Sequence, residues 1–309
     1  MLIHGFVRHT GVPFHAITTE LEHNSVLRPL TTLEQDRALS LSVVPFAGNK
    51  VSLAAIRQVI QPETRLVVMT HGSNVLGSVQ EIKPIAEYLY TNDIFFIVDG
   101  AQTAGHFPIS LSDIPVGAFV FTGHKALFGI PGTGGFYIPD PDAIAITRQG
   151  GTGTDSQALT QPSDMPMRFE TGTLNYPGIA SLLAGLRFIN TESLEEIERK
   201  GRDLTGYFIR ELQHMPGITL YTTAPDLPVV SFNINSIDNH EAGFILVRAY
   251  NIITRTGLHC APLVHERIDG RKGCIRASFS WFNTRDECRA AAEAVREVVE
   301  SADPQISAD

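Results

Sequence analysis

The feature that most constrains the fold is an alternation of short apolar segments with segments of helical periodicity. Strands are predicted at 14–19, 41–46, 65–70, 94–100, 118–123 and 135–138. Helices are predicted between them at 25–39, 52–60 and 81–92. Strands that are apolar on both faces and that alternate with helices are typical of a largely parallel α/β sheet. The fold class predicted for this part of the chain is therefore α/β.

The amino-acid composition of the chain changes after Gly150. The segment 148–167 is polar and rich in turn residues, so it predicts a surface loop. The remaining elements comprise predicted helices at 176–189, 193–215 and 241–250 and predicted strands at 218–223, 228–234, 251–257 and 273–282. A final helix begins at Thr284, which forms a predicted capping box with Glu287. We expect a large α/β domain at 1–190 and a smaller α+β domain at 191–309.

Composition excludes several classes of function. The net charge of −9 argues against a nucleic-acid partner, because proteins that bind the phosphate backbone usually carry a clustered basic excess. No apolar run reaches the length of about 18 residues that a membrane span needs. The three cysteines form no C-x-x-C pair, which favours a reducing compartment and predicts a cytoplasmic protein.

Polar residues gather where the predicted parallel strands end. In such sheets ligands bind at the carboxyl ends of the strands, which places 70–71, Asp99 and 122–125 on one rim. Lys125 stands in "FTGHKALFGIPGTGG", where the glycines allow the backbone to approach a ligand closely. Most lysines lie on the surface, and Asp99 could be an ordinary turn residue. A lysine and a carboxylate on one rim are, however, the pair that pyridoxal phosphate requires.

These residues carry a resemblance to a known family. The chain resembles the cysteine desulfurases, in the class V aminotransferase family of fold-type I pyridoxal-phosphate enzymes. The matching stretches occur in family order: "ELEHNSVLRPL", "THGSNVLGSVQEIKPIAE", "VDGAQTAGHFPI", "FTGHKALFGIPGTGGFYI", "RFETGTLNYPGI" and "RTGLHCAPLVH". The resemblance implies fold type I, with a smaller C-terminal domain that carries the Cys260 loop.

The resemblance also implies roles around the ring of pyridoxal 5'-phosphate. His23 would stack on the ring and move protons during the reaction. Asn74 and Gln102 would lie near the phenolic oxygen. Asp99 would pair with the pyridinium nitrogen, and Lys125 would hold the aldehyde.

Further roles concern the anionic groups. Thr122 and His124 would donate hydrogen bonds to the cofactor phosphate. Thr173 would reach the phosphate of a neighbouring subunit, so the resemblance implies a homodimer. Arg276 would bind the substrate carboxylate, for which a guanidinium is suited because it donates two parallel hydrogen bonds.

Cys260 is the predicted nucleophile. It lies between a strand and a proline, where Arg255 and His259 would favour the reactive thiolate, and Arg255 is also a candidate substrate-binding residue. In the family, a cysteine here attacks the sulfur of L-cysteine, which yields alanine and an enzyme persulfide. The persulfide then supplies sulfur to an acceptor protein, for example in iron–sulfur cluster assembly. Cys274 and Cys288 are predicted to be structural.

A metal site is not expected. His259, Cys260 and His265 are potential ligands, but their spacing matches no usual zinc pattern.

Three alternatives remain. The same fold hosts class V aminotransferases and selenocysteine lyases, which would use Lys125 without needing Cys260. Members of the family also begin further upstream, with a turn that cradles the cofactor phosphate, so the resemblance implies an N-terminally truncated chain. A truncated chain could be a non-catalytic remnant or a dimer partner.

Overall fold

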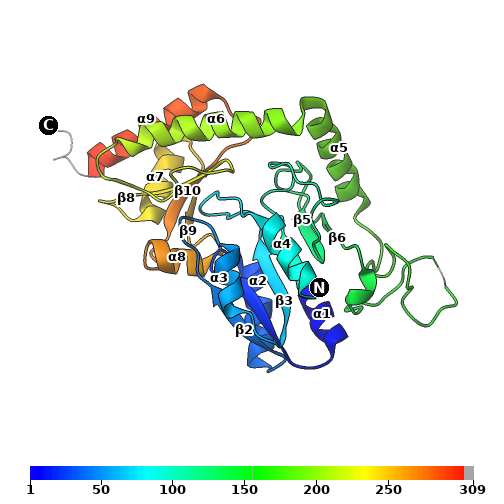
Figure 1. Ribbon diagram of the computed structural model, residues 1–309. Helices are drawn as coiled ribbons and strands as arrows, with labels where there is room; N and C mark the ends of the chain where they lie inside the picture. Colours follow the sequence, from blue (N-terminus) through cyan, green and yellow to red (C-terminus); the bar gives the residue numbers. More distant parts are fainter. Residues whose placement is uncertain (155, 303–309) are drawn as a thin grey trace.

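The chain forms two sheets joined by long helices (Figure 1), and the computed structural model describes residues 1–154 and 156–302. Position 155 of the predicted loop and residues 303–309 of the predicted small domain lie outside the described residues. The helices are α1 (Leu2–Thr10), α2 (Asn24–Gln35), α3 (Leu53–Val59), α4 (Ile82–Thr91), α5 (Tyr176–Glu192), α6 (Leu194–Gln213), α7 (Asn239–Tyr250), α8 (Pro262–Ile268) and α9 (Arg285–Ala302), with a short 3₁₀ helix at Pro141–Ala143. The strands are β1 (Phe14–Thr19), β2 (Leu39–Val44), β3 (Thr64–Thr70), β4 (Phe95–Asp99), β5 (Ala118–Thr122), β6 (Gly134–Tyr137), β7 (Ile218–Leu220), β8 (Val229–Ile234), β9 (Arg255–Gly257) and β10 (Cys274–Ser278).

The first sheet is the predicted parallel sheet. Its strand order is β2-β1-β3-β4-β5-β6, and only the edge strand β6 runs antiparallel to its neighbour. The ladder between β3 and β4 pairs Thr70 with Asp99 at the carboxyl ends of both strands. The prediction of a mainly parallel α/β sheet is therefore confirmed.

Helices cover both faces of this sheet. Successive residues of a strand point to opposite sides of the sheet, so each strand contributes side chains to two separate cores. On β3, Leu66 and Val68 pack in the hydrophobic core that includes the apolar residues of α1 and α2. Val67 and Met69 pack in the other core, with the apolar residues of α3 and α4. The central strands β3 and β4 are largely apolar because most of their residues are buried, whereas the edge strands β2 and β6 carry exposed residues.

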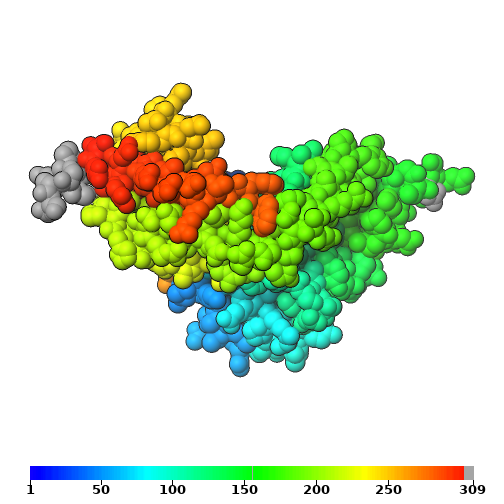
Figure 2. Space-filling model, turned by 90° about the horizontal axis from the view of Figure 1, so that it is seen from above, coloured from blue at the N-terminus to red at the C-terminus, as the bar shows by residue number. Residues whose placement is uncertain are grey.

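The second sheet is antiparallel, with the order β7-β8-β10-β9. Its hydrophobic core includes residues of α6, α7 and α9. The helices α6 and α9 lie side by side along one edge of the molecule (Figures 1 and 2). The predicted capping box is present: the Thr284 hydroxyl accepts from the Glu287 amide at 3.2 Å, and the Glu287 carboxylate accepts from the Thr284 amide at 2.9 Å.

Several elements differ from the sequence-based prediction: α1 is not among the predicted helices, and β2 begins and ends two residues earlier than predicted. The strand predicted at 251–257 is limited to β9, because Asn251 adopts a left-handed conformation that ends α7 (φ 57°) and delays the start of the strand. Helix α8 is not predicted at all, although Pro262 occupies its first turn, where proline is favoured. The predicted domain boundary near residue 191 falls in the last turn of α5 and stays a prediction. No helix of the described chain is both long and apolar enough to cross a bilayer.

Candidate active site

The candidate site lies at the carboxyl ends of the parallel strands. His23 follows β1, Asn74 follows β3, Asp99 ends β4 and Lys125 stands three residues after β5. Four separate strands thus bring residues that are distant in the sequence to one rim. Arg255, Cys260 and Arg276 come to the same rim from the second sheet, as their contacts below show.

Lys125 lies in the turn after β5, and the residue as a whole is exposed. Its ammonium group is nevertheless surrounded closely enough that loss of hydration lowers its pKa. The charges of Arg276 and Arg255 lower this pKa further, whereas that of Asp99 opposes the change. A lysine with a lowered pKa is more readily the free amine that condenses with a carbonyl.

Helix α5 packs against the turn after β5 that carries Lys125, called here the lysine turn. A Cβ atom at Gly185 would lie 2.0 Å from the backbone carbonyl oxygen of Leu127. Only glycine therefore allows α5 to approach the turn this closely.

His23 is held by a capping interaction. It is the N-cap of α2, and its Nδ1 accepts a hydrogen bond from the Ser25 amide at 3.0 Å. Burial lowers the His23 pKa, and the nearby Lys125 charge lowers it further. The neutral ring that results carries its proton on Nε2, because Nδ1 is the acceptor.

Glu22 is a site residue that the sequence analysis missed. Its side chain is fully buried, and its Oε1 accepts from the Thr19 hydroxyl at 2.6 Å and from the Thr70 amide at 2.9 Å. Its Oε2 has no partner in the described structure. Burial raises the Glu22 pKa to about 8, and the charge of Asp99 contributes. An acid directly before His23, at the end of a buried strand, was the signal that could have identified it.

Asp99 keeps its carboxylate in place through the backbone. Its Oδ1 accepts a hydrogen bond from the Ala101 amide at 2.9 Å. The neighbouring Glu22 is largely neutral below pH 8, so it places no second negative charge beside Asp99.

The Cys260 loop connects β9 to α8. His259 and Cys260 both have left-handed backbone conformations (φ 49° and 59°), which residues with a Cβ rarely adopt. Cys260 is half-buried, whereas Cys274 and Cys288 are buried. An Nη2 group of Arg255 donates to the Cys260 Sγ at 3.4 Å. The guanidinium thus places a positively charged hydrogen-bond donor at this sulfur.

His259 does not act on Cys260 as predicted. Its Nε2 lies 3.1 Å from the backbone carbonyl oxygen of Cys274, so the ring faces β10. Burial lowers the His259 pKa to about 3, with the Arg276 charge contributing. The ring is therefore neutral, and of the two predicted neighbours only Arg255 supplies positive charge.

Arg276 and Asn74 tie the two sheets together. The Arg276 Nη1 donates to the backbone carbonyl of Asn74 at 2.9 Å, and the Asn74 side-chain amide donates to the backbone carbonyl of His259 at 2.8 Å. The Cys260 carbonyl in turn accepts from the Asn24 amide at 2.8 Å. Burial and the charge of Arg255 lower the Arg276 pKa, yet a guanidinium stays charged.

The remaining predicted residues are less closely connected. Thr122 lies at the end of β5, and its buried hydroxyl oxygen has no hydrogen-bond partner in the described structure. Gln102 is half-buried, and His124 and Thr173 are exposed. Among the described residues, no hydrogen bond links Gln102, His124 or Thr173 to the other site residues, so their roles stay predictions.

Together, a parallel sheet flanked by helices and a rim carrying a lysine, an aspartate and two arginines define an α/β protein suited to an anionic, carbonyl-bearing ligand. The profile of the family described as aminotransferase class-V matches residues 1–290. The chain belongs to this family.

Relatives within the family carry a narrower name. The chain is 31% identical over 290 residues to a probable cysteine desulfurase of Methanothermobacter thermautotrophicus, covering 91% of this chain and 72% of that protein. It is 32% identical over 277 residues to a cysteine desulfurase of Pectobacterium carotovorum subsp. carotovorum, covering 88% and 67%. An apo structure of a cysteine desulfurase from Thermococcus onnurineus NA1 superposes with a TM-score of 0.88 at 28% identity, covering 96% of this chain and 75% of the other. The predicted fold, fold type I, is thereby confirmed.

Proposed function

We propose that this chain is a pyridoxal-phosphate-dependent cysteine desulfurase that converts L-cysteine to L-alanine and retains the sulfur as a persulfide on Cys260. The observation that most supports this proposal is the environment of Cys260. The residue is half-buried, its backbone has a left-handed conformation, and the Arg255 guanidinium contacts its sulfur. A structural cysteine needs none of these features.

The chain's own residues fit the cofactor. The unpartnered, buried hydroxyl of Thr122 is a donor suited to a phosphate oxygen. Asp99, whose neighbour Glu22 is largely neutral, would pair with the pyridinium nitrogen, while Lys125 would hold the aldehyde. When bound, the cofactor supplies an electron sink for the substrate carbon.

Arg276 and Arg255 would position the substrate. Both are close enough to Lys125 to lower its pKa, so a carboxylate bound between them lies near the amine. The Cys260 thiolate would then attack the substrate sulfur. An S–S bond forms as the carbon–sulfur bond breaks, the electron pair stays with the carbon, and a proton added to that carbon completes alanine.

His23 would carry protons at this site. Its Nδ1 is engaged by the Ser25 amide, so proton exchange takes place at Nε2. A ring with a lowered pKa is neutral at physiological pH and can accept a proton without first losing one.

A homodimer is proposed as the working form. Helix α5 exposes an apolar stripe at helical spacing, which consists of Tyr176, Ile179, Leu183 and Leu186. Exposed apolar surface of this kind is typical of protein interfaces. The exposed Thr173 stands just before this helix and would reach the phosphate in a neighbouring subunit. The free state of the three cysteines fits a cytoplasmic protein that passes sulfur to an acceptor.

The decisive experiment follows alanine formation from L-cysteine in the presence of pyridoxal phosphate and a thiol. Cys260→Ala should abolish the formation of both alanine and sulfide. Cys288→Ala should retain both activities, because Cys288 is buried in the hydrophobic core of the second sheet. Sulfur release that survives Cys260→Ala would contradict the persulfide step. Transamination of alanine with a keto acid, unaffected by Cys260→Ala, would instead identify an aminotransferase, and a preference for selenocysteine would identify a selenocysteine lyase.

A further inference from the structure

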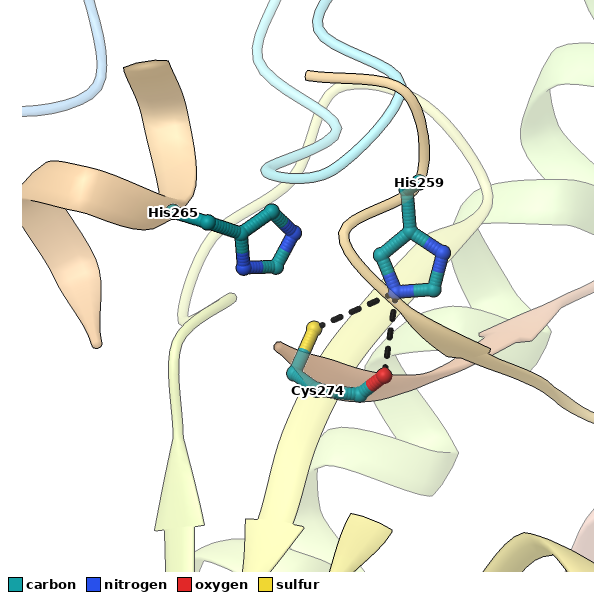
Figure 3. A group of neighbouring side chains, drawn as sticks. All are labelled: His259, His265 and Cys274. Carbon is teal, nitrogen blue, oxygen red and sulfur yellow. Dashed lines mark hydrogen bonds between the residues drawn. The ribbon is translucent and has the colours of Figure 1, made fainter. Parts of the chain in front are cut away.

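Three buried side chains that the proposed reaction does not use converge behind the Cys260 loop. His259 comes from that loop, His265 from α8 and Cys274 from β10, and their side chains point toward one another (Figure 3). One nitrogen from each ring and the sulfur lie within 4.8 Å of each other. The residues are at most 2% exposed. Two imidazoles and a thiol form a typical donor set for a borderline-soft metal ion.

His265 is prepared as a ligand. Its Nδ1 lies 2.6 Å from the Asp269 carboxylate, so Nδ1 donates to that carboxylate and Nε2 is the nitrogen available to a metal ion. That buried Nε2 has no hydrogen-bond partner in the described structure. Histidine ligands commonly donate their second ring nitrogen to a carboxylate in this way, which orients the ring and raises its basicity.

The other two donors are already close together. The Cys274 Sγ lies 3.4 Å from the His259 Nε2. Tetrahedral zinc, with bonds of about 2.3 Å to sulfur and about 2.0–2.1 Å to nitrogen, separates such atoms by about 3.5 Å. The His259 Nε2 also faces the Cys274 carbonyl at 3.1 Å, so on metal binding its proton would move to Nδ1, which is buried and unpartnered.

We propose that His259, His265 and Cys274 bind one Zn²⁺ ion, with Asp269 orienting His265. Binding releases the Cys274 thiol proton. The site differs from the set first considered from the sequence, because Cys274 replaces Cys260 beside the two histidines. The earlier expectation of no metal rested on spacing along the chain, and β10 brings in a ligand that this spacing did not include.

The ion would join the Cys260 loop to the second sheet. His259 directly precedes Cys260, and its backbone carbonyl is already held by Asn74. A metal bond to its ring would fix the loop from a second direction. Zinc binding itself does not depend on the proposed desulfurase activity. The restraint that the ion places on the Cys260 loop matters for catalysis only through that proposed activity.

The test uses the full chain, freed of metal by dialysis against a chelator. Titration with Zn²⁺ against a chromophoric chelator should show one tight equivalent per chain. Co²⁺ should replace it and give a thiolate-to-cobalt charge-transfer band together with the strong visible bands of a tetrahedral site. Absence of a bound equivalent, or a cobalt spectrum without the thiolate band, would overturn the proposal whatever the variants do.

Variants assign the ligands. Cys274→Ser should remove the charge-transfer band, and Asp269→Asn should weaken Zn²⁺ binding by about 10–100-fold, the usual effect of losing an orienting partner. Cys260→Ala and Cys288→Ala are matched cysteine controls and should keep both the band and the affinity. Loss of the band in Cys260→Ala, or its retention in Cys274→Ser, would refute the assignment. Circular dichroism confirms that each variant is folded.

Discussion

The side-chain amide of Asn74 donates a 2.8 Å hydrogen bond to the backbone carbonyl of His259, 185 positions later in the chain. This bond connects the end of β3 to the Cys260 loop. The position of the proposed nucleophile therefore depends on a residue of the proposed cofactor rim.

Asn74→Ala should loosen the Cys260 loop, because it leaves the buried carbonyl without its donor. A hydrogen bond of this kind stabilises by about 1 kcal/mol, so alkylation of Cys260 by iodoacetamide should accelerate about fivefold. The rate is measured by mass spectrometry of the peptide. An unchanged rate in a folded variant would show that the bond does not restrain the loop.

Lys125→Ala should abolish turnover, with a loss of at least about 10²–10⁴-fold, the effect of removing a positioned acid or base. Borohydride reduction of the cofactor-loaded protein followed by peptide mapping should mark Lys125. Lys83→Ala, on the exposed side of α4, is the control and should retain both activity and label. A label on another lysine would end the proposal.

Arg276→Lys should raise the KM for L-cysteine by about 10–100-fold, because lysine keeps the charge but loses the paired donors to a carboxylate. The variant also loses the bond to the Asn74 carbonyl. Steady-state kinetics separate the two effects: a substrate role raises KM, whereas a purely structural role lowers the folded fraction and leaves KM unchanged.

Glu22→Gln should change how stability depends on pH. Burial raises the pKa of Glu22 to about 8 in the folded protein, above its unfolded value near 4.5. The folded state therefore binds more protons between these values, and the free energy of unfolding falls as pH rises across this window, by up to about 1.4 kcal/mol per unit. The neutral glutamine has no such loss.

Urea unfolding of both proteins from pH 5 to pH 8 tests this expectation. The wild-type chain should lose stability relative to Glu22→Gln throughout this range. Parallel curves would mean that Glu22 is not protonated in the folded chain.

Leu183→Glu should disrupt the proposed dimer, because it places a charge in the centre of the apolar stripe on α5. Light scattering after size-exclusion chromatography should then report a monomer. Leu159→Glu is the control, since Leu159 is fully exposed in the loop before α5. Equal masses for wild type and Leu183→Glu would place the interface elsewhere.

Much of the parallel sheet could be predicted, because strands buried on both faces are continuously apolar. The bounds predicted for β1 match those observed, and the rim follows from topology alone. The contributions of the second sheet were harder to foresee. Cys274 and Arg276 stand two residues apart on β10, yet their side chains contact different groups. Arg276 reaches Asn74, whereas Cys274 lies beside two histidines, and only the fold shows these contacts. Glu22 was missed because burial and a raised pKa are properties of the folded chain, and the sequence does not distinguish a buried glutamate from an ordinary surface glutamate.

The contact of Gly185 with the lysine turn has a mechanical consequence. Helix α5 is held against that turn and is separated from α6 only by Ser193, whose φ is 67°. The second sheet therefore cannot rotate freely: it must either bend the chain at Ser193 or drag α5 with it. Lys125 precedes this joint in the chain and Cys260 follows it, but Asn24 and Asn74 hold the Cys260 loop to the first sheet. A bend at Ser193 would therefore have to break those bonds before it could change the gap across which sulfur would travel.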